Sequence, residues 1–297
     1  MMDTIKKKSM EGEVMHKRKI IISSILALVI VVGVFFGFSK HTEAVNKKNY
    51  IQTSTPTIFF HGYGSSYNAE TQMTGAIKKA GVTRKIVRVN VSPNGYAKLI
   101  GAIPKGTKNP LVEVNFDNNK MGNYHTAGKW AKNVIELLQE NFKFNSVNLV
   151  GHSMGNMAIN YYIMDNAGKK GLPKVNKVVD IAGHFNGILG INDEPNQMKL
   201  MKNGKPTKMD SDYKELLKLR KVYPTNTKVL NIYGDKGDGT HSDGSVSNAS
   251  SKSLRYLVSD RAKSYQEKKI KGKMAQHSKL HENKEVDKLL INFLWKK

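Results

Sequence analysis

The chain has 297 residues, 39% of them hydrophobic, which is enough for one large α/β domain behind an N-terminal extension. It contains no cysteine, so disulfides, thiolate metal sites and a cysteine nucleophile are excluded. The formal net charge of +24 favours an anionic membrane or cell-wall surface as a partner, although widely scattered lysines also serve general solubility. No nucleic-acid reader motif is present and the basic residues are not interleaved with aromatic ones, so we expect no nucleic-acid partner.

The N-terminal part predicts a basic cytoplasmic leader (1–19), a transmembrane segment (20–38) and a polar linker (39–54). Residues 20–38 are apolar and uncharged, close to the ~20 residues that span a bilayer, and Lys17-Arg18-Lys19 precedes them. A cleaved signal peptide usually has a shorter core of about 7–15 residues. We therefore expect an N-terminal anchor with the rest of the chain outside the cytoplasm; the alternative is secretion after cleavage near Ala44.

Beyond the linker, strand and helix patterns alternate, which predicts an α/β fold with a mostly parallel sheet and helices on both faces. Strands are expected over 57–60, 85–91, 111–116, 147–150, 175–182, 229–233 and 268–274, and helices over 69–80, 123–142, 156–166, 212–221, 250–257 and 283–295. Residues 55–297 should form one domain. Within it, residues 185–224 form either a small cap, which would act as a lid if mobile, or an ordinary loop and helix.

Gly151-His152-Ser153-Met154-Gly155 lies between an expected strand and an expected helix, which is the context of a nucleophile elbow. In such a turn the serine hydroxyl points away from the sheet, and the flanking glycines avoid collisions with the neighbouring strand and helix. The amide of Met154, at the helix start, would point at the position of an oxyanion.

An earlier loop supplies a second amide. His61-Gly62-Tyr63-Gly64 follows the first strand, and its glycines allow the loop to fold close to the serine. The Tyr63 amide would be the second oxyanion donor.

A serine nucleophile also needs an orienting carboxylate and a base. Three aspartates compete for the first role in one loop: Asp235 at the end of a strand, Asp238 in a turn, and Asp243. This Gly/Asp-rich loop also suggests calcium, but it lacks the terminal glutamate of an EF-hand, and we expect neither a metal nor a cofactor. For the base, His277 and His281 lie between the last strand and the last helix. The other candidates are earlier: His125, His152, His184 and His241.

Over residues 57–295 the sequence resembles the α/β-hydrolase superfamily, in particular a group of exported Firmicute hydrolases related to small bacterial lipases. The resemblance is carried by residues 61–64, 151–155, 243–246 and 277–283. It implies the chain order Ser, Asp, His, for which the four earlier histidines come too soon.

The same resemblance ranks the candidates. Asp243 begins an Asp-x-x-Val step like that of the triad acid, with Asp238 and Asp235 as alternatives. His277 stands nine residues before the apolar Val286 of the last helix, which favours it over His281.

We therefore expect a serine hydrolase that cleaves small-molecule or lipid acyl esters through an acyl-enzyme on Ser153. A cell-surface acyltransferase or peptidase with the same triad is the first alternative, because the pocket and not the fold sets the substrate. A non-catalytic protein that binds the cell wall or the membrane through its charge is the second.

Overall fold

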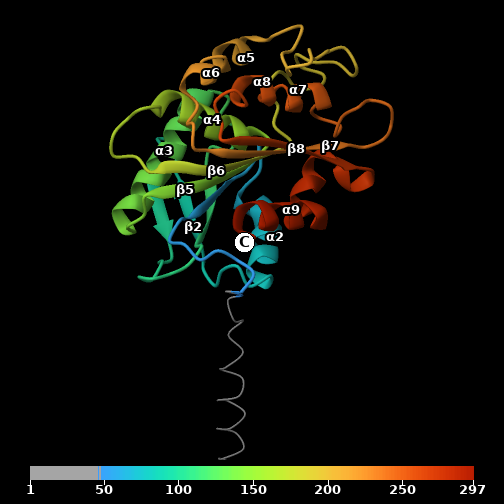
Figure 1. The fold of residues 1–297 in the computed structure, drawn as a ribbon. Coiled ribbons are helices and arrows are strands. Elements are labelled where there is room, and N and C mark those ends of the chain that lie inside the picture. The colour runs from blue at the N-terminus through green and yellow to red at the C-terminus, as the bar shows by residue number, and fades with distance from the viewer. Residues whose placement is uncertain (1–45, 47) are drawn as a thin grey trace, which may run out of the picture. The chain divides into compact units, whose positions relative to one another are not determined.

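The computed structural model describes residue 46 and residues 48–297 (Figure 1). The predicted leader, the apolar segment 20–38 and Ala44 lie outside these residues. None of the helices in the described part is both long and apolar enough to cross a membrane.

In the described part of the chain, eight strands form one sheet in the order β3-β2-β4-β1-β5-β6-β7-β8. All neighbouring strands are parallel except β2 and β3, so the predicted mostly parallel sheet is confirmed. The strands are β1 (Thr57–Phe60), β2 (Ile86–Val91), β3 (Ala97–Ile100), β4 (Leu111–Phe116), β5 (Ser146–His152), β6 (Lys174–Ile181), β7 (Lys228–Asp235) and β8 (Ser264–Lys271).

The central strands are apolar on both sides because helices cover both faces of the sheet (Figure 1). On one face α3 (Tyr124–Asn141) and α4 (Met154–Asn166) pack around the buried Trp130. On the other face α2 (Thr71–Lys79) and α9 (Lys284–Trp295) pack around Trp295. The remaining helices are α5 (Ser211–Leu216), α6 (Leu219–Val222), α7 (Asn248–Lys252), α8 (Leu254–Val258) and the 3-10 turns η1 (Tyr67–Glu70), η2 (Lys273–Ala275) and η3 (His277–Glu282).

Among the strands, the sequence prediction is wrong at the two edges of the sheet. The sequence does not predict β3, because only Ala97 of its four residues is buried and no apolar run marks it; the strand pairs with β2 across a turn at residues 92–95. The last strand was expected over 268–274 but is β8, which ends before Gly272, a residue with φ +89°. β8 is mostly polar with only Ile270 buried, and its lysines protect an exposed edge. Strand periodicity is weak in such a sequence.

Residues 185–224 join the core at their two ends, at the N-terminal end through the fully buried Phe185. The expected helix 212–221 is interrupted, giving α5 and α6, which bury Tyr213, Leu216, Leu219 and Tyr223 in the same apolar cluster as α3 and α4. Most of 187–210 has no regular structure beyond isolated bridges. At the start of the described chain, the Ile51 amide donates to the Trp295 carbonyl, so the end of the predicted linker lies against α9.

Candidate active site

Ser153 occupies a strained turn between β5 and α4. Its φ of +53° and ψ of −118° are rarely adopted by a residue with a side chain. Hydrogen bonds hold the turn. The Ser153 backbone amide donates to the Ile181 carbonyl at 2.9 Å, and the side-chain amide of Asn156 donates to the backbone carbonyls of Ser153 and Ile181. A Cβ on Gly155 would lie 2.1 Å from the Phe60 carbonyl oxygen, so only glycine fits there. The strained serine is thus fixed by rigid neighbours.

The structure brings Ser153, His277 and Asp243 together by two hydrogen bonds. His277 Nε2 lies 2.9 Å from Ser153 Oγ, and His277 Nδ1 lies 2.8 Å from Asp243 Oδ2. The Asp243 carboxylate can only accept, so the proton of the neutral His277 imidazole lies on Nδ1. Nε2 is then the nitrogen that accepts from the serine hydroxyl.

Asp243 is itself held by the loop it begins. Its carboxylate is buried, and Oδ1 accepts the amides of Ser245 and Val246 at 2.9 and 2.7 Å. The His277 amide donates to the Asp243 carbonyl at 2.9 Å, so backbone and side-chain contacts both join these two segments.

The alternative acids lie elsewhere. The exposed Asp238 pairs with Lys236 at 2.8 Å, and this lysine and Thr240 hold the pKa of its carboxyl well below the usual range. Asp235 accepts from Asn248 at 3.0 Å and from Lys269 at 3.3 Å. Neither carboxylate contacts His277 within the described residues, whereas Asp243 does.

The alternative base, His281, packs edge-on against His152 with ring centroids 4.9 Å apart and has no hydrogen bond to Ser153 in the described structure. Burial lowers the pKa of its imidazole.

The loop at residues 61–64 lies beside the serine, since a Cβ on Gly62 would be 3.0 Å from Ser153 Cβ. His61 shapes this loop: its Nε2 accepts the Phe116 amide at 3.0 Å, so its Nδ1 donates to the Gly62 carbonyl at 2.8 Å. The Gly62 carbonyl and the Tyr63 N–H belong to one peptide group and point in opposite directions. This hydrogen bond therefore turns the Tyr63 N–H away from the His61 ring. Among the described residues that amide has no hydrogen-bond partner.

Sequence reasoning missed the contacts of two buried histidines, His152 and His184. His152 Nε2 donates to the His277 carbonyl at 3.0 Å, and the two rings are 5.0 Å apart. His184 follows β6 and hydrogen-bonds Tyr124. Burial is the main cause that lowers the pKa of both imidazoles, so both are uncharged near neutral pH. The sequence signal that could have drawn attention to them is their place at the carboxyl end of β5 (His152) and just beyond that of β6 (His184).

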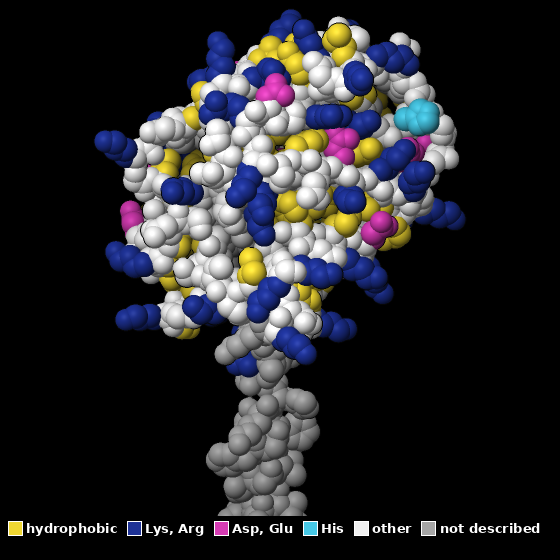
Figure 2. Space-filling model, viewed as in Figure 1, with side chains coloured by type: hydrophobic (Ala, Val, Ile, Leu, Met, Phe, Trp, Pro, Cys, Tyr) yellow, Lys and Arg dark blue, Asp and Glu magenta, His cyan; other side chains and the backbone are white. Residues whose placement is uncertain are grey.

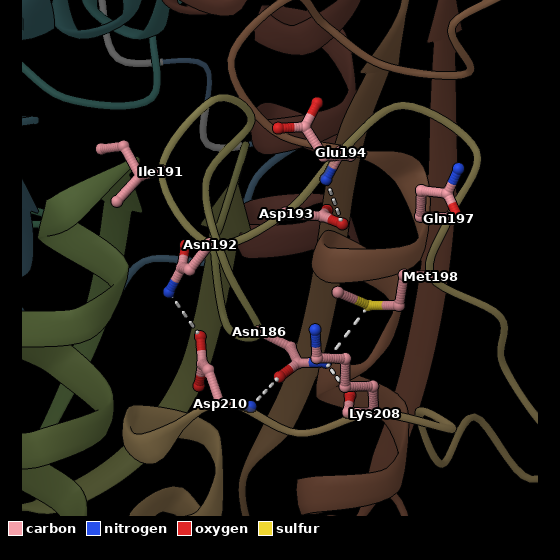
Figure 3. Close-up of a pocket in the computed structure, with 9 residues that line it drawn as sticks. All are labelled: Asn186, Ile191, Asn192, Asp193, Glu194, Gln197, Met198, Lys208 and Asp210. Carbon is pink, nitrogen blue, oxygen red and sulfur yellow. Dashed lines mark hydrogen bonds between the residues drawn. The ribbon is translucent and has the colours of Figure 1, made fainter.

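A cavity of about 510 Å³ lies among residues 186–210 (Figure 3). The Leu189 amide donates to the Ser245 carbonyl, so this segment lies next to the loop that carries Asp243. Ser247 Oγ donates to Asp193 at its wall, and Asn192 donates to Asp210 across it. Ser153, His277 and Asp243 are not among the residues that line this cavity. No group of His, Asp or Glu side chains in the described part of the chain is arranged to hold a metal.

Residues 44–297 match the family described as alpha/beta hydrolase of unknown function (DUF915). The chain belongs to this family. A crystal structure of a Listeria innocua protein is 28% identical, with a TM-score of 0.74 over 82% of this chain and 94% of that one. A candidate cell surface hydrolase from Lactobacillus plantarum is 23% identical, with a TM-score of 0.66 over 81% and 91%. A search of curated proteins found no match. The predicted α/β-hydrolase fold and the resemblance to hydrolases of Firmicutes are therefore confirmed.

Proposed function

We propose that this α/β hydrolase cleaves carboxylic esters through Ser153, His277 and Asp243. The observation that carries the proposal is the continuous chain of hydrogen bonds from Ser153 Oγ through His277 to the buried Asp243. Function on this fold is decided by such a site and not by the fold itself.

In the proposed reaction His277 Nε2 takes the Ser153 proton as Oγ attacks the ester carbonyl. The amides of Tyr63 and Met154 stabilise the oxyanion of the tetrahedral intermediate. His277 then gives its proton to the leaving alcohol, which leaves an acyl group on Ser153. Water, deprotonated by the same imidazole, attacks the acyl-enzyme and releases the acid. Transfer to another alcohol instead of water would make the protein an acyltransferase, and a peptide substrate would make it a peptidase.

Fluorophosphonate labelling tests the proposal directly, because this probe reacts with an activated serine. We expect the wild-type protein to be labelled and the Ser153→Ala variant not to be, together with a loss of about 10⁶ in kcat on a nitrophenyl ester. Ser54→Ala, a matched change at an exposed serine, should be labelled like wild type. Unchanged hydrolysis by Ser153→Ala would refute the triad. Failure of the wild-type protein to react or hydrolyse would favour the non-catalytic binding alternative.

We also propose an extracytoplasmic location, with the segment 20–38 as anchor or, alternatively, with secretion after cleavage near Ala44. Two observations support this location: basic residues directly precede the apolar run, and the chain resembles in fold the Lactobacillus plantarum protein that is described as a cell surface hydrolase. Lys and Arg side chains are spread over the face seen in Figure 2, with few Asp or Glu among them. Such a surface suits anionic lipid head groups or wall phosphates, and binding to anionic vesicles should weaken as salt is raised.

A further inference from the structure

The parallel strands of the sheet begin along one edge, opposite the edge at which Ser153 lies. Their first residues are in register: Thr57 of β1 pairs with Leu111 of β4, and Lys228 of β7 pairs with Ser264 of β8. We call this the amino edge. Ser153 directly follows β5, at the opposite, carboxyl edge. Because the longer strands have six to eight residues, the two edges are about 20–25 Å apart.

The amino edge is strongly basic. The loops that lead into the parallel strands there are 48–56, 80–85, 101–110, 142–145, 167–173, 223–227 and 259–263. Together with the first residues of β6 and β7, these loops contain twelve basic residues: Lys48, Arg84, Lys85, Lys105, Lys108, Lys143, Lys169, Lys170, Lys174, Lys228, Arg261 and Lys263. Their one acidic residue is Asp260, which is already paired with Arg220 at 2.6 Å.

The carboxyl edge has no such excess of charge. Its segments are 61–66, 92–96, 117–123, 182–210, 236–247 and 272–283. They contain eight lysines against seven aspartates and glutamates. Lysines that served solubility alone would be interspersed with acidic residues at both edges. The basic residues are instead concentrated at the edge away from the candidate active site, which indicates an anionic partner there.

The lysines of the amino edge can reach such a partner. The following are exposed, and within the described residues none of them forms an ion pair: Lys105, Lys108, Lys143, Lys170, Lys174, Lys228 and Lys263. Two of them, Lys105 and Lys143, line a cavity of about 350 Å³ whose other lining residues include Ile103, Phe142 and Phe144. A phospholipid surface offers both negative charge and apolar groups, whereas a soluble polyanion offers only the charge.

The chain enters the domain at the same edge. The Asn46 amide donates to the Gly81 carbonyl at 2.7 Å, in the loop before β2, and the Thr53 amide donates to Asn109, in the loop before β4. Residue 38, the end of the proposed anchor, precedes Asn46 by eight positions. Eight residues span at most about 28 Å, so an anchor in a bilayer holds the start of the amino edge within that distance of the lipid.

We propose that the amino edge docks on an anionic phospholipid bilayer through its lysines, and that the candidate active site at the carboxyl edge therefore faces away from that bilayer. This inference rests on the proposed extracytoplasmic location with residues 20–38 as anchor. It implies that the substrate esters come from the aqueous or wall side and are not lipids of the membrane that holds the protein. Salt should weaken the docking, because lysines attract anionic head groups only within a Debye length, about 8 Å at physiological ionic strength.

The orientation can be measured on the full-length protein, since a chain without cysteine accepts one fluorescent label at one introduced cysteine. Thr225→Cys places the label at the amino edge, and Met274→Cys places it beyond β8 at the carboxyl edge; both positions are exposed. The protein is reconstituted into vesicles of equal parts phosphatidylglycerol and phosphatidylcholine that contain an acceptor-labelled lipid. At low salt we expect energy transfer from residue 225 to exceed that from residue 274 by about threefold or more, because the edges are about 20–25 Å apart. High salt, or phosphatidylcholine alone, should reduce this ratio.

A matched pair of charge reversals tests the lysines. Lys105→Glu combined with Lys143→Glu should lower the transfer from residue 225 in anionic vesicles toward its value in phosphatidylcholine. Lys199→Glu combined with Lys202→Glu changes the net charge equally, but at exposed lysines of the carboxyl edge. This control should keep the wild-type transfer.

Equal transfer from residues 225 and 274 in anionic vesicles, or an amino-edge double variant that behaves like the control, overturns the inference. A label at residue 225 that stays away from anionic vesicles, and whose emission shifts only when soluble poly(glycerol phosphate) is added, also overturns it and assigns the edge to a wall polymer. Flotation of the vesicles in high salt tests the anchor separately. Loss of the protein there refutes the anchor, whereas docking at low salt persists because it needs only the charge of the amino edge.

Discussion

Asp180 is a buried carboxyl that should limit the stability of the protein at neutral and alkaline pH. It lies on β6, 1% exposed, where Oδ1 accepts from Asn160 at 3.1 Å and Oδ2 has no partner. Its register neighbour on β7 is Asn231, whose Oδ1 also has no partner. A proton on Asp180 would supply the missing donor between two neighbouring acceptors. Burial accordingly raises the pKa of Asp180 to about 7.

The direction of the pH effect follows from this shift. The folded carboxyl titrates near 7 and the unfolded one near 3.8, so between these values the folded state binds more protons. The contribution of Asp180 to stability is fully present below pH 3.8 and is lost as the pH rises through 7. The free energy of unfolding lost to this shift is on the order of 4 kcal/mol at pH 8 and 2 kcal/mol at pH 5.

Asp180→Asn should remove this loss. The amide keeps the oxygen that Asn160 donates to and adds a donor for Asn231, as the protonated acid would. Urea unfolding at pH 5 and pH 8 should show a variant that is more stable than wild type, with a gain that grows by about 2–3 kcal/mol between the two pH values. The control is Asp260→Asn, at an exposed carboxylate paired with Arg220, where the difference should stay within about 1 kcal/mol. A gain that does not grow with pH, or a variant less stable at pH 8, would refute a neutral Asp180.

The remaining predictions concern the proposed site. Asp243→Asn should lower kcat by about 10⁴ through lost orientation of His277, whereas Asp238→Asn should lower it only a few-fold; steady-state kinetics on a nitrophenyl ester that showed the reverse would reassign the acid. His277→Ala should be nearly inactive while His281→Ala keeps much of its activity, and inactivity of the His281 variant alone would move the base to that residue. Gly155→Ala should fold poorly, because its Cβ would meet the Phe60 carbonyl at 2.1 Å; circular dichroism and a thermal transition like those of wild type would contradict the packing at the elbow.

The core of the fold could be predicted because its strands are buried on both sides and read as apolar runs. β4 has the expected bounds, and α3 and α9 differ from theirs only at the ends. The edge strands could not be predicted in the same way. Each has only one buried residue, Ala97 in β3 and Ile270 in β8, so neither burial nor alternation marks where these strands begin.

Each segment of the candidate site carries a local signal: glycines around Ser153, a Gly/Asp loop for Asp243, a histidine before the last helix. The choice among three aspartates and two histidines came only from the resemblance to the superfamily, through the Asp-x-x-Val step at Asp243 and the spacing from His277 to Val286. Physical chemistry of the sequence alone could not make this choice, because the hydrogen bonds of His277 with Asp243 and with Ser153 span 34 and 124 positions of the chain. The hydrogen bonds of His152 and His184 likewise join distant segments, and their sequence neighbourhood does not reveal them.

The neutrality of these histidines matters for the proposed reaction. When His277 takes the Ser153 proton, positive charge develops on a ring whose centroid lies 5.0 Å from that of His152. A charged imidazole at that distance would oppose the transfer by about 3 kcal/mol at an effective dielectric constant of ~20, or more than a hundredfold in rate. Burial keeps His152 and His184 uncharged, so both can pack beside the base without this cost. His152 can then donate its one proton to the His277 carbonyl and help to hold the base in line with Ser153.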